Sequence, residues 1–172
     1  MALQTKVYTS MASALPGMPA STIETHYLAL TPLASADITV GNFVFVDTTT
    51  PSKVSPSGTG MVRGIAVFVR NYVAAGFAPT MKIPAGAPVT VATNGKFWVT
   101  CTNASPAVGH YVFASQTDGS VSTAAANTTQ SGKTLTNFVV EAVTGTTANS
   151  LILISNQTPT VVATAAAGGV GG

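Results

Sequence analysis

The stretch "APVTVATNGKFWVTCT" (Ala87–Thr102) decides the fold prediction. Two β-prone runs flank its Asn-Gly dipeptide, which is the strongest short-range signal for a β-hairpin because a type I′ turn needs positive φ at both positions. With a two-residue loop, Val91 lies opposite Trp98, and their side chains share one face. The other face carries three apolar side chains, those of Phe97, Val99 and Cys101.

Both faces of this predicted hairpin are therefore partly apolar. A hairpin that covers one small core alternates cleanly between apolar and polar side chains. Two apolar faces indicate either that one face covers the domain's own core while the other meets a neighbouring subunit, or that the segment crosses between two sheets. The sequence leaves both interpretations open.

Short β-prone runs continue on both sides of this stretch, with turn signals between them. They are Thr25–Thr31, Asn42–Asp47, Met61–Arg70, His110–Ser115, Ser120–Thr123, Asn137–Val143 and Leu151–Ser155. Strands at near-regular spacing predict an all-β fold, a small β-barrel or sandwich of short antiparallel strands. Residues 48–60 are rich in Pro, Ser and Gly and predict an exposed loop. Residues 123–133 predict a loop or one short helical turn.

The two ends of the chain differ from its middle. We expect residues 1–24 to form an extended N-terminal arm, residues 25–158 the β domain, and residues 159–172 a flexible tail rich in Gly and Ala. The arm contains "LPGMPAST", whose prolines disfavour both a helix and a central strand. Its apolar residues have no periodicity of their own, so they need another surface to lie on, unless the terminus is loosely ordered.

The composition points to an assembly subunit. Only 7% of the 172 residues are charged, while 46% are hydrophobic, whereas a soluble domain carries about 25% charged residues. The polar surface must therefore come from Thr, Ser, Asn and Gly. Neutral surface of this kind costs little to desolvate and suits permanent burial against partners. We expect a homo-oligomer or a larger assembly.

The charge pattern and the short apolar runs argue against two kinds of partner, nucleic acids and membranes. The seven basic residues form no cluster and the net charge is +2, whereas nucleic-acid binders show a basic patch or stripe. No apolar run approaches the ~18 residues that would span a bilayer. One cysteine cannot form an internal disulfide. We therefore expect neither a nucleic-acid partner nor a membrane partner.

Candidate catalytic and metal-binding residues are few. Cys101 could be a nucleophile, but that role needs a base nearby, and His26 and His110 lie in no recognisable motif. Cys101 is in line with two apolar residues of its strand, which favours a buried small hydrophobe. Neither histidine has the spacing of a metal ligand. We predict no metal and no cofactor.

The sequence does not support two further enzyme motifs, a carboxylate pair and a phosphate-binding loop. A carbohydrate-cleaving enzyme needs two carboxylates in one cleft, and the spacing of the five acids favours no pair; they are Glu24, Asp37, Asp47, Asp118 and Glu141. The segment "SGKT" (Ser131–Thr134) ends like a phosphate-binding loop, but Asn127 stands where that loop needs its first glycine. The sequence therefore predicts no enzyme.

Four segments, taken in order, carry a family resemblance. They are "GMVRGIAVFV" (Gly60–Val69), "IPAGAPVTVATNGKFWV" (Ile83–Val99), "GHYVFASQTDGSV" (Gly109–Val121) and "LILIS" (Leu151–Ser155). Over roughly residues 41–155 the chain resembles the tailed-bacteriophage capsid cement, or decoration, proteins. The resemblance implies a small β domain on the outside of the phage head, often a trimer, that clamps neighbouring major capsid proteins. It implies no enzymatic activity, and the arm and the tail depart from it.

This interpretation gives a set of expected capsid contacts. They are Tyr8, Met11, Leu15, Met18, Arg63, Arg70 and Trp98. Apolar arm residues would lie on the shell, and Arg63, Arg70 and Lys96 would pair with acidic capsid residues, unless they are ordinary solvated charges. Deletion of residues 1–20 is expected to weaken capsid binding and to leave the domain folded. The alternative is a tail-fibre or adhesin-type module that binds host glycans, in which Tyr72, Phe77 and Trp98 would converge in an exposed groove.

Overall fold

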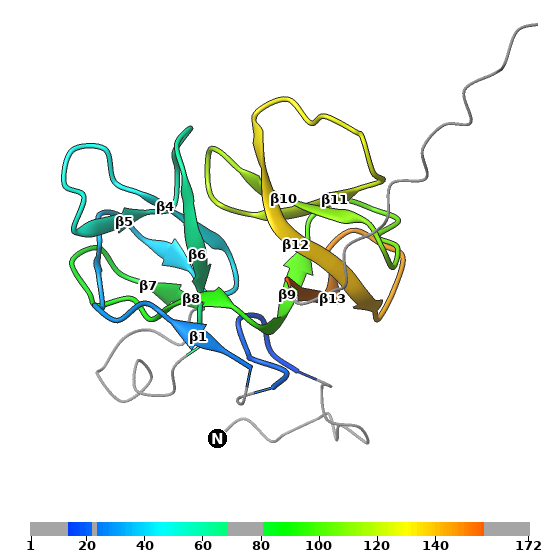
Figure 1. Ribbon diagram of the computed structural model, residues 1–172, viewed down its shortest axis with the longest axis horizontal. Coiled ribbons are helices and arrows are strands. Elements are labelled where there is room, and N and C mark those ends of the chain that lie inside the picture. The colour runs from blue at the N-terminus through cyan, green and yellow to red at the C-terminus, as the bar shows by residue number, and fades with distance from the viewer. Residues whose placement is uncertain (1–13, 22–23, 69–80, 157–172) are drawn as a thin grey trace, which may run out of the picture.

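The computed structural model describes residues 14–21, 24–68 and 81–156, and the regular structure of these residues is entirely β (Figure 1). The strands are β1 (His26–Tyr27), β2 (Leu33–Ala34), β3 (Ile38–Thr39), β4 (Phe43–Val46), β5 (Lys53–Ser55), β6 (Val62–Ala66), β7 (Lys82–Ile83), β8 (Val91–Asn94), β9 (Lys96–Cys101), β10 (Tyr111–Ser115), β11 (Val121–Ala124), β12 (Lys133–Val143) and β13 (Ser150–Ser155). They form a six-stranded sheet of order β1-β8-β6-β4-β5-β2, a closed barrel of order β10-β11-β9-β13-β12, and a β3-β7 pair. The predicted all-β fold with a small barrel is confirmed. No helix in the described ranges is long and apolar enough to cross a membrane.

Strand β4 separates two apolar cores. Its residues are continuously apolar, and the first three are fully buried, as is typical of a strand that is covered on both faces. Phe43 and Phe45 contribute to a core shared with the barrel. Val44 contributes to a second core, which the β3-β7 pair closes with Ile38 and Ile83. Because β6 and β8 repeat this alternation, the sheet forms the wall between the two cores.

The barrel is organised around β9. Its side chains alternate as predicted: three are buried inside the barrel, those of Phe97, Val99 and Cys101. The strand pairs antiparallel with β13 along its whole length and parallel with β11 at its end. The ring of Phe138, on β12, lies 5.7 Å from the ring of Phe43 and 6.3 Å from that of Phe97, measured between centroids. One core therefore runs without a break from the sheet into the barrel.

The predicted Asn-Gly hairpin is wrong. Strand β8 pairs with β6 and β1, and β9 pairs with β13 and β11, so the two runs do not pair with each other. Gly95 has φ of +131°, and its N–H donates to Oδ1 of Asn156 at 2.9 Å, while Asn156 Nδ2 donates to the Thr93 carbonyl. The dipeptide is the point where the chain leaves the sheet for the barrel, as the second interpretation of the two apolar faces proposed.

Part of the expected arm packs on the chain's own domain. Gly17 donates its N–H to the Trp98 carbonyl at 2.7 Å, and Trp98 N–H donates to the Met18 carbonyl at 3.0 Å. Residues 17–20 thus extend along the edge of β9, with an isolated bridge between Pro19 and Phe97. A Cβ at Gly17 would lie 2.6 Å from a methyl carbon of Val40, so only glycine fits here.

Residues 48–60 also differ from the prediction of an exposed loop. Strand β5 lies within them and pairs with β4 and β2. Val54 is fully buried in the second core. The Pro-rich and Ser-rich composition of this segment gave no indication that Val54 is a core residue. Residues 125–132, by contrast, form a loop without a helix, which agrees with one of the two predictions for that segment.

Candidate binding surface

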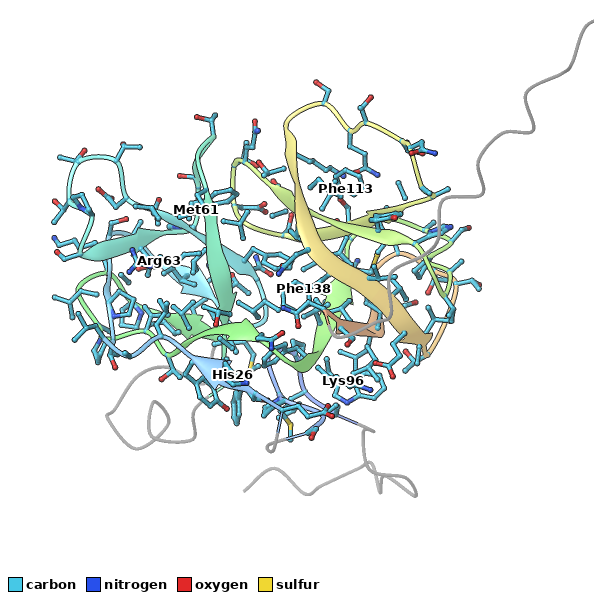
Figure 2. The ribbon with its side chains drawn as sticks, in the orientation of Figure 1. His26, Met61, Arg63, Lys96, Phe113 and Phe138 are labelled. Atoms are coloured by element: carbon cyan, nitrogen blue, oxygen red, sulfur yellow. The ribbon has the colours of Figure 1, made fainter. Side chains whose placement is uncertain are left out.

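The expected capsid contacts are only partly described by the structure. Tyr8, Met11 and Arg70 lie outside the described residues. Leu15, Met18 and Trp98 lie close together, because Met18 and Trp98 are hydrogen-bonded neighbours and the Leu15 N–H donates to Met18 Sδ at 3.4 Å. The Leu15 side chain is exposed, whereas those of Met18 and Trp98 are half-buried. Arg63 lies apart from this group, on β6 of the sheet (Figure 2).

An ion pair joins two strands of the barrel that lie on either side of β13. Lys96 Nζ and Glu141 Oε1 are 2.8 Å apart, and both side chains are about one-third exposed. The hydrogen bond to Glu141, and then its negative charge, raise the pKa of Lys96 above its usual 10.5 against a small opposing effect of burial. Glu141 Oε2 is buried, and no described residue forms a hydrogen bond with it. The contact explains why this acid can stand inside a strand: it braces β9 against β12.

Several large apolar side chains are exposed to solvent in the described residues. They are Leu15, Tyr27, Leu30, Leu33, Met61, Val108 and Leu135. Leu30 is 83% exposed and Met61 72% exposed. Scattered exposed apolar residues are normal on a monomer. On a chain with so little charge, they are the side chains that a partner surface would cover at least cost.

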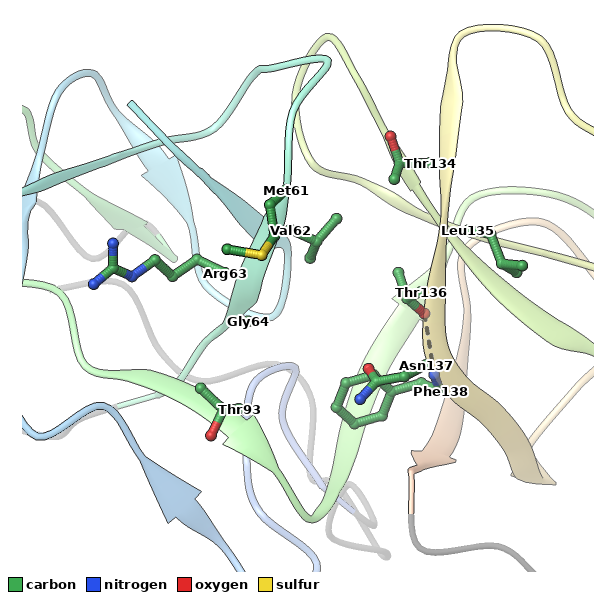
Figure 3. Close-up of a pocket in the computed structure, with 10 residues that line it drawn as sticks. All are labelled: Met61, Val62, Arg63, Gly64, Thr93, Thr134, Leu135, Thr136, Asn137 and Phe138. Atoms are coloured by element: carbon green, nitrogen blue, oxygen red, sulfur yellow. Dashed lines mark hydrogen bonds between the residues drawn. The ribbon is translucent and has the colours of Figure 1, made fainter. Parts of the chain in front are cut away.

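A groove of about 400 Å³ separates the sheet from the first half of β12 (Figure 3). Met61, Val62 and Arg63 line it on the side of the sheet, and residues 134–138 line it on the side of the barrel. Val62 and Thr136 point into it from opposite sides (Figure 3). None of its described lining residues is acidic. No local sequence pattern predicts this groove, because it arises between strands that are distant in the chain.

The residues considered for catalysis in the sequence are Cys101, His26 and His110. Cys101 is fully buried, and its Sγ lies 3.1 Å from Asn103 Oδ1, which confirms the prediction of a small buried hydrophobe. His26 is exposed and His110 is half-buried. Within the described ranges, no three His, Cys, Asp or Glu residues are grouped so that they could hold a metal ion.

Comparison with known proteins identifies the family of this chain. A family model described as "Structural cement protein (E217 gp24/Pam3 gp6)", a phage cement family, matches residues 3–157. The chain belongs to this family. Its structure also resembles a chain of "The capsid of Myoviridae Phage XM1", with a TM-score of 0.66 and 17% identity over 91% of this chain and 98% of that chain, which shows a shared fold. No curated protein sequence matches the chain.

The family resemblance seen in the sequence is therefore confirmed. This cement protein is a structural component of a phage virion, it is associated with the capsid shell, and its role is to stabilise that shell. A cement protein acts by binding capsid proteins. The glycan-binding alternative gains no support: Trp98 is half-buried beside residues 17–18, and Tyr72 and Phe77 lie outside the described residues.

Proposed function

We propose that this cement protein sits on the outside of the phage head, as a trimer, and bridges neighbouring major capsid protein subunits. The observation that carries the proposal is the family match over residues 3–157, nearly the whole chain. The exposed apolar side chains and the low charge agree with a surface that is covered in an assembly. The protein holds subunits together and performs no chemical step.

The physical basis is multivalent binding. A shell filled with DNA is under outward stress, and a subunit that grips two neighbours adds binding free energy across the seam between them. Several modest contacts on one rigid body multiply, because each later contact forms at a high effective concentration. Since few charges take part, we expect binding to depend only weakly on salt.

A cyclic trimer would also cover an exposed strand edge. Strand β1 is one edge of the six-stranded sheet, and its Tyr27 is exposed, whereas residues 86–89 already bond to β2 at the other edge. Unpaired edges are sites of aggregation unless something covers them. In a ring, each subunit can cover an edge of the next. The arm residues Tyr8, Met11, Leu15 and Met18, with Arg70 and Trp98, remain proposed capsid contacts.

Electron microscopy of expanded shells, with and without added protein, tests this proposal. We expect additional density on the outer surface, at positions that touch at least two capsid subunits and that repeat around local three-fold axes. Density inside the shell, or density that touches one capsid subunit only, would contradict the bridging role. Density with two-fold or no local symmetry would contradict the trimer alone.

A further inference from the structure

The groove between the sheet and the barrel is bordered by two strand segments with unpaired edges. Strand β12 pairs with β13 only from Val139 onward, so among the described residues its first half has no strand neighbour on that side. Strand β6 pairs with β8 only at Ile65 and Ala66, so within the same described ranges Val62 has none either. Both open segments line the groove. Figure 3 shows them on opposite sides of it.

The hydrogen-bond pattern shows which backbone groups of β12 are available. Gln116 N–H donates to the Gly132 carbonyl, and β12 continues antiparallel to β10 with Ala114 opposite Thr134. Because hydrogen-bonded pairs alternate with non-bonded pairs in such a ladder, Thr134 bonds toward β10. The N–H and C=O of Leu135 therefore point away from β10, toward the open edge, and Leu135 is 56% exposed.

The same reasoning applies to β6. Val46 N–H donates to the Met61 carbonyl at 3.3 Å, and Phe45 lies opposite Val62. Val62 is thus the non-bonded position of its pair with β4, and its N–H and C=O point toward the groove. Exposed edges of this kind accept an extended peptide as an additional strand, which is a recurring mode of peptide recognition.

The charge on β6 indicates the kind of peptide. Arg63 lines the groove from β6, but its side chain extends away from β12 (Figure 3), and among the described residues it bonds only to the Pro51 carbonyl, at 3.3 Å. A cross-strand neighbour with a carboxylate would complement it. The parts of this chain outside the described residues contain no Asp or Glu. These parts of the chain therefore cannot supply an acidic segment, and we assign the segment to a different protein.

We propose that the groove binds an extended segment of a capsid protein, which lies as an added strand between the open edges of β6 and β12 and places an acidic side chain beside Arg63 of β6. This inference rests on the proposed function, since it assigns the capsid contact to a specific surface. It differs from the arm hypothesis, because the groove lies between strands of the β domain and not on residues 1–24.

Matched variants of the full-length protein test the groove on expanded shells that lack cement protein. Leu135→Pro removes the free N–H and blocks strand addition, whereas Leu135→Thr keeps the backbone group and changes only the side chain. Arg63→Glu reverses the charge at the groove, whereas Lys82→Glu reverses an exposed charge on β7. We expect Leu135→Pro and Arg63→Glu each to weaken binding about tenfold or more, as the loss of a hydrogen bond and of a charge contact predicts. The two controls are expected to match wild type.

A photo-crosslinking amino acid in place of Met61, which is exposed and lines the groove, identifies the occupant. We expect the crosslinked peptide to be a capsid protein segment that contains Asp or Glu. Equal binding by Leu135→Pro, Arg63→Glu and wild type would overturn the groove while leaving the cement role intact. A crosslink to residues 1–13 of a second copy would also overturn the groove while leaving the cement role intact. If wild type itself does not bind shells, both proposals fail together.

Discussion

The backbone N–H of Phe43 donates to the carbonyl oxygen of Gly119 at 2.9 Å. Phe43 lies on β4 of the sheet, and Gly119 lies in the turn between β10 and β11 of the barrel. Gly119 has φ of +69°, and a Cβ at this position would overlap the Phe43 carbonyl oxygen. The turn can approach β4 this closely only because residue 119 is a glycine. The contact therefore fixes the barrel against the sheet.

Gly119→Ala is expected to destabilise the protein strongly. A side chain at positive φ adds backbone strain, and the overlap with Phe43 adds a steric cost, so we expect a loss of about 3 kcal/mol or more in the free energy of unfolding. Gly132→Ala is the matched control, because Gly132 has φ of +68° and open space around it; strain alone costs about 1–2 kcal/mol. Urea denaturation of both variants measures the difference. Equal losses would mean that the close approach to Phe43 has no energetic weight.

Phe138→Ala is expected to loosen the whole molecule. Phe138 is 1% exposed and contacts aromatic rings on β4 and β9, so its removal leaves a cavity between sheet and barrel that costs about 3–5 kcal/mol. Leu135→Ala, at an exposed position of the same strand, is the control and is expected to change stability little. Since one core joins both parts, thermal unfolding should remain a single transition with a lower Tm. Two separate transitions in wild type would contradict the shared core.

Asp118 is expected to contribute to acid sensitivity. Burial raises the pKa of Asp118, but the hydrogen bonds from Ser115 and Ser120 outweigh burial, so its pKa lies below the usual 3.8. A lowered native pKa gives stability that is present above the unfolded-state value and is lost as the pH falls through the native value. Asp118→Asn should therefore lose less stability than wild type between pH 7 and about pH 2.5. Urea denaturation at both values measures this, and identical losses for the two proteins would refute it.

Two truncations should separate capsid contact from folding. Removal of residues 1–13 leaves the pairing of residues 17–20 with β9 intact. We expect this variant to keep its Tm and to bind shells more weakly. Removal of residues 1–20 also exposes the edge of β9, so we expect a lower Tm and aggregation. The earlier expectation that residues 1–20 can be deleted without harm to the domain therefore no longer holds. Unchanged shell binding after removal of residues 1–13 would contradict the proposed capsid contacts of Tyr8 and Met11.

Local sequence patterns predicted where strands form better than they predicted which strands pair with each other. The alternation of Phe97, Val99 and Cys101 predicted the buried face of β9, and the turn signal between the runs His110–Ser115 and Ser120–Thr123 corresponds to a hairpin of β10 and β11. The Asn-Gly dipeptide at residues 94–95 led to the wrong prediction of a hairpin. Asn156 supplies the hydrogen bonds that a hairpin turn would have made within itself. That residue is 61 positions away from Gly95, and no local pattern shows the contact.

The candidate binding surface was predicted less well than the fold. Composition indicated an assembly subunit, and the order of four segments indicated the family. The groove could not be predicted, because it depends on where β12 extends beyond its pairing with β13 and where β6 extends beyond its pairing with β8. Leu135 and Met61 are exposed for the same reason, although their apolar side chains suggest core positions in the sequence.

The most direct test of the cement role is the stability of DNA-filled heads that lack this protein. Heads are heated in increasing steps, with and without the purified full-length protein, and the release of DNA is followed with a fluorescent dye. We predict that added protein raises the temperature of release, saturates at a fixed number of copies per head, and acts with little dependence on salt. Release at the same temperature with and without saturating protein would contradict the account.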